Sequence, residues 1–370
     1  MSAKRFRARR ARLELLEPRQ MLAGDVFVSV VDGNLVAEGD ALNNQVAITA
    51  GAEPGSLIIR GLDGTNIVRA AAETSPPASE IVVTGVTGGA RIGLGTGDDR
   101  LVLANVGFQR GVSIRMGEGN DSVAIGLRPA PAAAAEAVEP PMNGSVRIGG
   151  ALEISTGEGN DRVHVDQAGI GGPLNIETGA GNDGVRLGHQ PPPAAAASTV
   201  ATDAIAEPEI TPVLRVMRAT NINLGAGEDE LAADAVMAAQ GLTVNAGEGS
   251  DALHLNHVSS GGPLTLLGGA GDGADNIDLA HVRAGTAAIL TGAGNDRVQI
   301  VDSAFRVLGV ALEGGDDTLT IGRTQAQWAF LFGGDGIDTL NNRGGNRFGH
   351  RFVRGFETVT NPETDPEPIV

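Results

Sequence analysis

The chain of 370 residues contains 55 Gly, 18 Pro and no Cys, and its formal net charge is −18. The lack of Cys excludes disulfides and thiolate metal sites. The negative charge disfavours nucleic acid as a partner, because an acidic body repels phosphate. No apolar run is long enough to predict a membrane-spanning segment.

Residues 1–25 differ in charge from the rest of the chain. Seven Lys or Arg oppose three acidic residues there, so this segment carries +4 and the remainder −22 of the total −18. A basic start followed by the apolar run 13–22 is typical of a targeting segment, and a basic amphipathic helix without that role is the alternative. Residues 16–22 read Leu-Glu-Pro-Arg-Gln-Met-Leu. They resemble the LEPR-XLL segment of many exported, repeat-bearing bacterial proteins, with Met21 in place of a Leu. The resemblance implies an extracellular or cell-surface location.

Residues 26–78 are predicted to form a divergent β cap at the N-terminal end. Residues 26–31 read Val-Phe-Val-Ser-Val-Val, a turn follows at 32–34, and residues 35–37 are again apolar, which indicates a hairpin. Asn44 precedes Gln-Val-Ala-Ile and takes the place that Asp has in the later repeats. A cap is needed because an open coil exposes apolar core and an unpaired strand edge.

Residues 79–342 contain a repeat, seen most clearly as Gly-Glu-Gly-Asn-Asp at 117–121. Successive copies of the Asp, from Asp99 to Asp338, are 22, 40, 22, 46, 22, 24, 21, 21 and 21 residues apart. The two long steps contain Pro/Ala-rich inserts of 18 and 25 residues, at 127–144 and 189–213, and without them these steps become 22 and 21. A fixed period of this size predicts a solenoid.

The residue types within the repeat predict how each coil folds. Two Gly residues allow positive φ in a tight turn, and Asn and Asp bond to nearby backbone. Alternating apolar residues before and after the turn predict two strands, followed by a third short segment. We therefore predict an all-β, right-handed parallel β-helix of about ten coils with a period near 22 residues. Its expected interior includes Ile114, Val123, Ile125, Val163, Ile176, Leu187, Val244, Leu255, Val298 and Ile300.

The inserts and the C-terminal end complete the domain organisation. Each insert begins six residues after an Asp, so both should leave the coil at one corner, either as binding loops or, as their composition favours, as tolerated insertions. Residues 343–370 are predicted to form a cap and an acidic tail, with Phe348, Phe352 and Phe356 covering the last coil.

The row of Asp residues is the main candidate site. Stacked carboxylates ~4.8 Å apart repel by about 1 kcal/mol per pair even at the dielectric of water, so a cation would stabilise them. The repeat resembles the calcium-binding RTX nonapeptide of haemolysin-type proteins, Gly-Gly-x-Gly-x-Asp-x-apolar-x, which residues 333–341 match in full. The resemblance implies Ca²⁺ held between stacked turns. The alternative is that each Asp caps turn N–H groups. The candidate ligands are Asp99, Asp121, Asp161, Asp183, Asp229, Asp251, Asp275, Asp296, Asp317 and Asp338.

A second row lies six residues after the Asp and reads His257, His281 and Asp302, with His189 in the same place earlier. Such side chains bind Zn²⁺, but no fourth ligand is visible, so an exposed polar ladder is favoured.

Many parallel β-helices are polysaccharide lyases or hydrolases, but fold alone does not assign an activity. An Asp that repeats in every coil favours structure over catalysis. We therefore predict an exported or cell-surface structural or adhesive solenoid, stabilised by calcium and not an enzyme. Its partner is expected to be a surface polysaccharide or a matrix protein. A carbohydrate-active enzyme is the alternative, and a mid-rod patch of exposed aromatic and basic residues would favour it.

Overall fold

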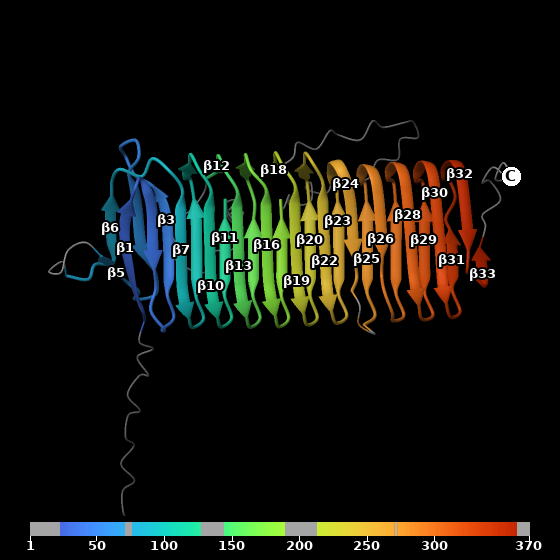
Figure 1. Cartoon of the computed structure of the whole chain (residues 1–370), viewed down its shortest axis with the longest axis horizontal. Helices are drawn as coiled ribbons and strands as arrows, with labels where there is room; N and C mark the ends of the chain where they lie inside the picture. The colour runs from blue at the N-terminus through green and yellow to red at the C-terminus, as the bar shows by residue number, and fades with distance from the viewer. Residues whose placement is uncertain are drawn as a thin grey trace, which may run out of the picture.

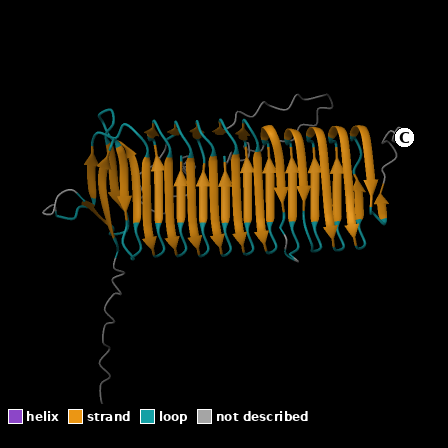
Figure 2. Cartoon of the chain, viewed as in Figure 1, coloured by secondary structure: helices purple, strands orange, loops and turns teal. Residues whose placement is uncertain are grey.

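The computed structural model describes residues 23–70, 76–126, 144–188, 213–269, 271 and 273–360. These residues form a β-solenoid of about ten coils with a period near 22 residues, which confirms the predicted fold class (Figures 1 and 2). Nineteen of the described strands form one sheet and fourteen form a second. The described residues contain no helix that could cross a membrane.

The larger sheet contains two series of strands. The long series lies before the Asp turn of each coil and consists of β7 (Ala90–Thr96), β10 (Val112–Glu118), β13 (Leu152–Glu158), β16 (Leu174–Ala180), β19 (Thr220–Ala226), β22 (Leu242–Glu248), β24 (Ser259–Leu267), β26 (Arg283–Leu290), β28 (Ala304–Gly314), β30 (Gln325–Asp335) and β32 (Arg347–Arg354). The short series is the predicted third segment and consists of β9 (Gly107–Phe108), β12 (Val146–Ile148), β15 (Ala168–Ile170), β18 (Leu214–Val216) and β21 (Val236–Ala238).

The smaller sheet contains the strands that follow the Asp turn. They are β3 (Gln45–Ala50), β8 (Arg100–Ala104), β11 (Ser122–Ile125), β14 (Arg162–Val165), β17 (Gly184–Leu187), β20 (Glu230–Asp234), β23 (Ala252–Asn256), β25 (Asn276–Ala280), β27 (Arg297–Val301), β29 (Thr318–Gly322), β31 (Thr339–Asn342) and β33 (Thr358–Thr360). Apart from β3, which also pairs with an antiparallel neighbour, each pairs only in parallel with the same strand of the next coil.

The cross-section of the solenoid changes at β24. Through Ser259 and Ser260 this strand pairs with the short strand β21, and through Leu264–Leu267 it pairs with the long strand β22. One strand therefore replaces two, and the later coils have two strands each instead of three. The register shifts once, between Ser260 and Pro263, where the chain turns the former corner.

The core lies between the two sheets and follows the alternation in the sequence. Equivalent residues stack in register, as Ile92, Ile114, Ile154 and Ile176 do along the long series. All ten residues predicted to be interior are buried. This register is strongly specified, because a slip of one residue would turn every apolar side chain toward solvent.

The N-terminal end combines a cap with a first coil. As predicted, β1 (Asp25–Val31) and β2 (Asn34–Glu38) form an antiparallel hairpin. However, β2 also pairs in parallel with β7, and β3 pairs in parallel with β8, so residues 34–50 already belong to the solenoid. The strands β4 (Leu57–Gly61) and β6 (Glu80–Val83) then add antiparallel neighbours, and β5 (Asn66–Arg69) pairs with β1.

The C-terminal residues form one more coil rather than a separate plug. The strands β32 and β33 pair in parallel with β30 and β31. Phe348 and Phe356 pack against the core, as expected of residues that cover the last coil. The prediction was wrong for Phe352, whose side chain lies on the outer face and is 51% exposed. The basic segment 1–22 and the tail 361–370 lie outside the described residues.

The two inserts lie almost wholly outside the described residues, but the residues that border them are placed. Each insert follows a strand of the smaller sheet (β11 or β17) and precedes a short strand (β12 or β18), so both interrupt the same corner. Gly126 and Gly188, just before the inserts, make the same backbone hydrogen bond, to the carbonyls of Leu103 and Val165.

We expect the simultaneous deletion of 127–143 and 189–212 to leave the rod folded, because the strands that border each insert already pair with the same strands of the adjacent coils. The melting temperature should change by no more than about 4 °C, which corresponds to roughly 3 kcal/mol in a chain of this size. Circular dichroism measures both the strand content and the melting temperature. Deletion of residues 168–170, which form β15, is the matched control and should lower the melting temperature strongly. A cooperative loss of strand signal in the double deletion would show that the inserts are structural.

Candidate functional site

The turn that carries the Asp residues depends on glycine for a steric reason. Gly117 and Gly119 adopt φ of 119° and 137°, a region that L side chains rarely occupy. A Cβ on Gly117 would lie 1.5 Å from the carbonyl oxygen of Gly95 in the preceding coil. The glycines therefore allow successive turns to approach closely enough to stack.

The Asp residues form a continuous hydrogen-bonded ladder along this corner. The backbone N–H of Asp99 donates to Oδ1 of Asp121 at 2.8 Å, and the N–H of Asp121 donates to Oδ1 of Asp161 at 2.7 Å. The same bond recurs through Asp183, Asp229, Asp251, Asp275, Asp296, Asp317 and Asp338. Asn44 starts the ladder and Glu357 ends it, since Asp338 donates to Glu357 Oε2 at 2.7 Å.

A second ladder connects the same turns in the opposite direction. The Oδ1 atom of Asn120 accepts the backbone N–H of Asn160 at 3.0 Å, and Oδ1 of Asn160 accepts that of Asn182 at 2.7 Å. Each Asp side chain thus reaches back to the preceding coil, whereas each Asn side chain reaches forward. The Asp side chains satisfy buried N–H groups and the Asn side chains satisfy exposed ones, and each bond of this kind contributes about 0.5–3 kcal/mol.

The ladder carboxyls are buried, with exposed fractions of 0 to 5% for the ten Asp residues. Burial raises the pKa of Asp99, Asp121, Asp229 and Asp275 to about 7, although the backbone N–H that each accepts opposes the shift. Burial also raises the pKa of Asp317 to about 6. Neighbouring Asp carboxylates raise these pKa values further, so the ladder titrates as a coupled set.

The residue just before the Gly-x-Gly turn faces the carboxyl from the interior. A Cβ on Gly333 would lie 2.5 Å from Oδ2 of Asp338, so glycine makes room there. In two other coils this position holds Thr156 or Thr178. Burial raises the pKa of Asp161 and of Asp183, and the hydroxyl of Thr156 or Thr178, respectively, acts to lower it. This buried position is where most repeats depart from the Gly-Gly start of the RTX pattern.

A calcium site at these turns would draw on the same carboxyls that form the ladder. Ca²⁺ takes six to eight hard oxygens, whereas here Oδ1 of each ladder Asp is occupied by a backbone N–H. Among the described residues, Oδ2 of Asp121, Asp229 and Asp251 is buried without a hydrogen-bond partner. No group of three His, Asp or Glu side chains that could hold a metal ion occurs in the described ranges. The ten Asp residues therefore lie in one row as predicted, and their role as calcium ligands stays a prediction.

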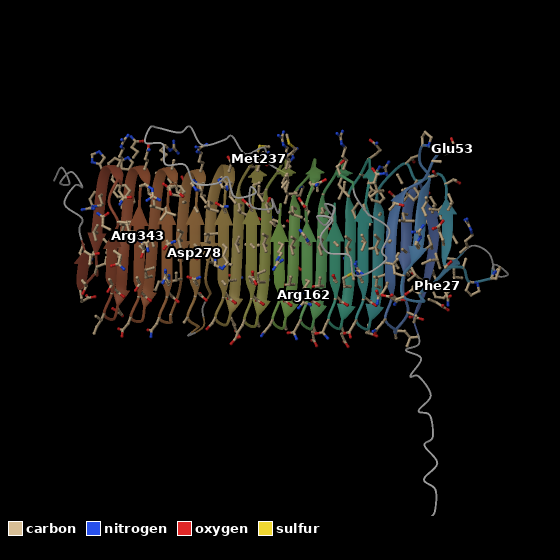
Figure 3. The ribbon with its side chains drawn as sticks, turned by 180° about the vertical axis from the view of Figure 1, so that it is seen from behind. Phe27, Glu53, Arg162, Met237, Asp278 and Arg343 are labelled. Atoms are coloured by element: carbon tan, nitrogen blue, oxygen red, sulfur yellow. The ribbon has the colours of Figure 1, made fainter. Side chains whose placement is uncertain are left out.

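An acidic stripe lies outside the ladder. Its members are exposed at the tips of the same turns, and oxygen atoms are visible along this edge of the rod in Figure 3. The residues of this acidic stripe are Asp98, Glu118, Glu158, Glu228 and Glu248.

The described residues six positions after a ladder Asp lie at a corner of the coil, and their backbone is in the left-handed region. His257, His281 and Asp302 have φ of 51°, 55° and 51°. The His257 and His281 rings stack with centroids 4.6 Å apart, and Asp302 accepts two hydrogen bonds from Arg323, which lowers its pKa. Asp302 is thus paired with a guanidinium, consistent with the polar-ladder interpretation. His189 lies outside the described residues.

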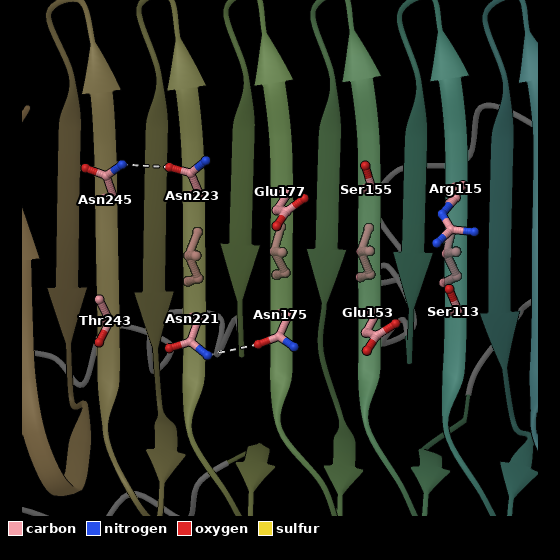
Figure 4. A pocket seen from close by; sticks show the side chains of 14 residues that line it. Ser113, Arg115, Glu153, Ser155, Asn175, Glu177, Asn221, Asn223, Thr243 and Asn245 are labelled. Atoms are coloured by element: carbon pink, nitrogen blue, oxygen red, sulfur yellow. Dashed lines mark hydrogen bonds between the residues drawn. The ribbon is translucent and has the colours of Figure 1, made fainter.

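Two features of the outer face of the larger sheet were missed by the sequence analysis. The first is a shallow polar groove over β10, β13, β16, β19 and β22 (Figure 4). Hydrogen bonds join Asn221 to Asn175 at 2.9 Å and Asn245 to Asn223 at 2.7 Å. Detecting these rows from the sequence requires the register between coils, because their members are 22 or 46 residues apart.

The second feature is an aromatic cluster over β30 and β32. Trp328 stacks on His350 with centroids 4.0 Å apart, and Phe330 stacks on Phe352 at 5.2 Å. The signal for it was present in the sequence, since six of the ten Phe and Trp residues fall within 328–356.

A scan against known protein families finds none that matches the chain, and a search of curated protein sequences finds no match either.

Proposed function

We propose that this chain is an exported structural or adhesive rod of a cell surface or extracellular matrix. The observation that supports it most is the uniformity of the Asp corner. The same Asp hydrogen bond connects coil after coil from Asn44 to Glu357, so no coil is distinguished as a reaction centre. Acidic residues spread over several turns, rather than one localised cluster, fit a structural element that resists non-specific association.

The enzymatic alternative has less support. Exposed aromatic side chains gather over the last two long strands instead of over the middle of the rod. In the groove, Glu153 pairs in register with Asn175, and Glu177 pairs with Ser155, so these two carboxylates are diagonal rather than opposite one another. We expect no release of reducing ends when the full chain is incubated with plant or bacterial polysaccharides.

Export is tested by localisation. The full chain carrying a C-terminal epitope tag, produced in a bacterium whose own proteins carry LEPR-XLL-like segments, is expected outside the cytoplasm. A variant lacking residues 1–22 should stay inside, because the basic segment that resembles a targeting signal has been removed. Immunoblotting of cell fractions measures the distribution, and an unaltered distribution of the variant would contradict the export proposal.

Calcium belongs to this proposal as a stabilising ion, in keeping with the resemblance of the turns to the RTX pattern. Millimolar calcium outside cells would then couple stability to export. A calcium titration of the melting temperature in chelator and in millimolar calcium tests this part of the proposal.

A further inference from the structure

The outer face of the larger sheet changes character along the rod. Over β10 to β22 its outward side chains are polar. Over β26 to β32 small, apolar or aromatic side chains point outward along the middle of the strands, and Arg283, Arg306, Arg347 and Arg354 are exposed nearer the strand ends. The strand register makes these two halves one continuous surface. One outward row, for example, runs through Asn175, Asn221, Thr243, Thr265, Ala288, Gly309, Phe330 and Phe352.

Five aromatic side chains in this second half form a cluster that we name the aromatic shelf. They are Trp328, Phe330 and Phe332 on β30 and His350 and Phe352 on β32. The rings of neighbouring strands are nearly parallel, with interplanar angles of 22° for Trp328–His350 and 5° for Phe330–Phe352. Phe332 and Phe352 remain 42% and 51% exposed. Exposed aromatics grouped on one face mark binding surfaces more often than isolated apolar residues do.

The strand next to the aromatic shelf carries short side chains at the positions that adjoin it. In register with Trp328, Phe330 and Phe332, the neighbouring strand β28 presents Val307, Gly309 and Ala311. A Cβ on Gly309 would meet no atom closer than 3.8 Å, so nothing overhangs it. A flat ring can therefore lie over Gly309 and pack against the face of Phe330 that Phe352 leaves free.

The first half of the face supplies hydrogen bonds instead of ring contacts. The Asn221–Asn175 and Asn245–Asn223 pairs each use one donor and one acceptor, which leaves further amide atoms directed to solvent (Figure 4). The charges there nearly balance, since Arg115 is accompanied by Glu153 and Glu177. A partner for the whole face must combine many hydroxyl-like groups with apolar ring faces, and it must be long.

From this combination we propose that an uncharged polysaccharide binds along the outer face of the larger sheet, with its sugar rings stacked at the aromatic shelf. The proposal deepens the adhesive function above and rests on it for access to such a polymer. The net charge of −18 disfavours an acidic polysaccharide over the rod as a whole, and Arg354, in register with Phe332, is a basic residue beside the shelf that could contact one. Aromatic stacking combined with amide and hydroxyl hydrogen bonds matches the chemistry of a neutral sugar chain, which has apolar ring faces and polar edges.

The test uses the fact that Trp328 is the only Trp in the chain and that Tyr is absent. Fluorescence excited near 295 nm therefore reports on the shelf alone. The full chain is titrated with soluble xylan, mixed-linkage glucan and laminarin, with polygalacturonate as the acidic comparison. We expect a saturable change in Trp328 emission with at least one neutral polymer and a change at least tenfold weaker with polygalacturonate. Depletion by insoluble cellulose or chitin provides a second readout.

Two kinds of variant test whether the change in Trp328 emission arises from binding at the outer face of the larger sheet. Phe332→Ala with Phe352→Ala should weaken binding at least tenfold, and Asn223→Ala with Asn245→Ala should weaken it severalfold while leaving Trp328 unaltered. The matched control is Ile337→Ala, which removes a side chain that is 66% exposed on a turn outside this face and should not affect binding.

Three outcomes would overturn the proposal. The first is a lack of binding to every neutral polymer, and the second is binding by the shelf variants that equals that of the parent. The third is concentration-dependent self-association that the shelf variants abolish, because the shelf would then be an interface between copies of the chain. Circular dichroism confirms that each variant is folded. None of these outcomes affects the localisation test, so the export proposal stands or falls separately.

Discussion

The free energy of unfolding is expected to fall as pH rises from about 4 to about 8 in the absence of divalent cations. Asp99, Asp121, Asp229 and Asp275 have folded-state pKa values of about 7, because burial disfavours their charged form. Their unfolded pKa is about 3.9. The folded state therefore binds more protons in this window, so the stability that is complete below pH 4 is lost as pH rises through 7. This is opposite to the usual behaviour of paired Asp residues.

The effect should be large, since one unit of pKa shift corresponds to about 1.4 kcal/mol. Several coupled carboxyls should together lower the free energy of unfolding by roughly 5 kcal/mol or more between pH 4 and pH 8. Denaturant titrations at a series of pH values measure it, at an ionic strength near 0.15 M so that the exposed acidic stripe is screened. A stability that is constant or rises over this range would contradict the prediction.

Replacing Asp121, Asp229 and Asp275 by Asn provides the control. Asn keeps the oxygen that accepts the backbone N–H of the preceding coil and resembles the protonated carboxyl in shape. Asn44 already accompanies the ladder at its N-terminal end, where its Nδ2 donates to backbone carbonyls of Leu42 and Leu94. The variant should lose much of the pH dependence and should be more stable than the parent at pH 8. Glu118→Gln with Glu158→Gln, on the exposed stripe, should leave most of the pH dependence in place.

The same measurement at pH 8 tests calcium. If Ca²⁺ binds the folded turns, each independent site stabilises them by about 2.7 kcal/mol at a hundredfold excess over Kd. Calcium would then reverse the loss of stability seen in chelator, and the triple Asn variant would respond much less. Equal stability of the parent in chelator and in millimolar calcium would remove calcium from the proposal and leave the Asp row as a hydrogen-bonded ladder.

Substituting Gly225 by Ala is expected to destabilise the rod strongly. Gly225 has φ of 107°, and a Cβ there would lie 1.7 Å from the carbonyl oxygen of Gly179. Neighbouring turns repeat this contact along the corner, so the backbone has no space into which it can move. We expect a loss of more than about 3 kcal/mol, the range typical of severe steric and backbone strain.

Gly169→Ala is the matched comparison, because Gly169 lies in a strand with ordinary backbone and no atom within 4 Å of its added Cβ. It should change stability by no more than about 0.5 kcal/mol. Because each coil contacts only its neighbours, Gly225→Ala should also divide the single unfolding transition into two. Denaturant unfolding followed by circular dichroism and by Trp328 fluorescence would resolve them. Coincident transitions with unaltered midpoints would show that the turn tolerates a side chain.

The sequence by itself determined the coil. The period near 22, the Gly-x-Gly turn and the alternation on either side of it are local patterns, and each specifies backbone conformation within a few residues. They were sufficient to predict the solenoid, the ten tested interior residues, the hairpin formed by residues 26–37 and the common corner of the two inserts. They also placed the ten Asp residues in one row, because a fixed period brings equivalent residues of successive coils together.

Only the tertiary structure decided what those rows do. The sequence of one turn does not indicate whether its Asp side chain points to solvent or bonds to the preceding coil, since both fit the same backbone. Stacking makes the difference, because it buries the carboxyl, occupies Oδ1 and raises the pKa of Asp121 to about 7. The aromatic shelf likewise depends on register, which brings Trp328 onto His350 and Phe330 onto Phe352 across 22 residues of chain. Such neighbours are set by pairing between coils, which no local pattern in one coil specifies.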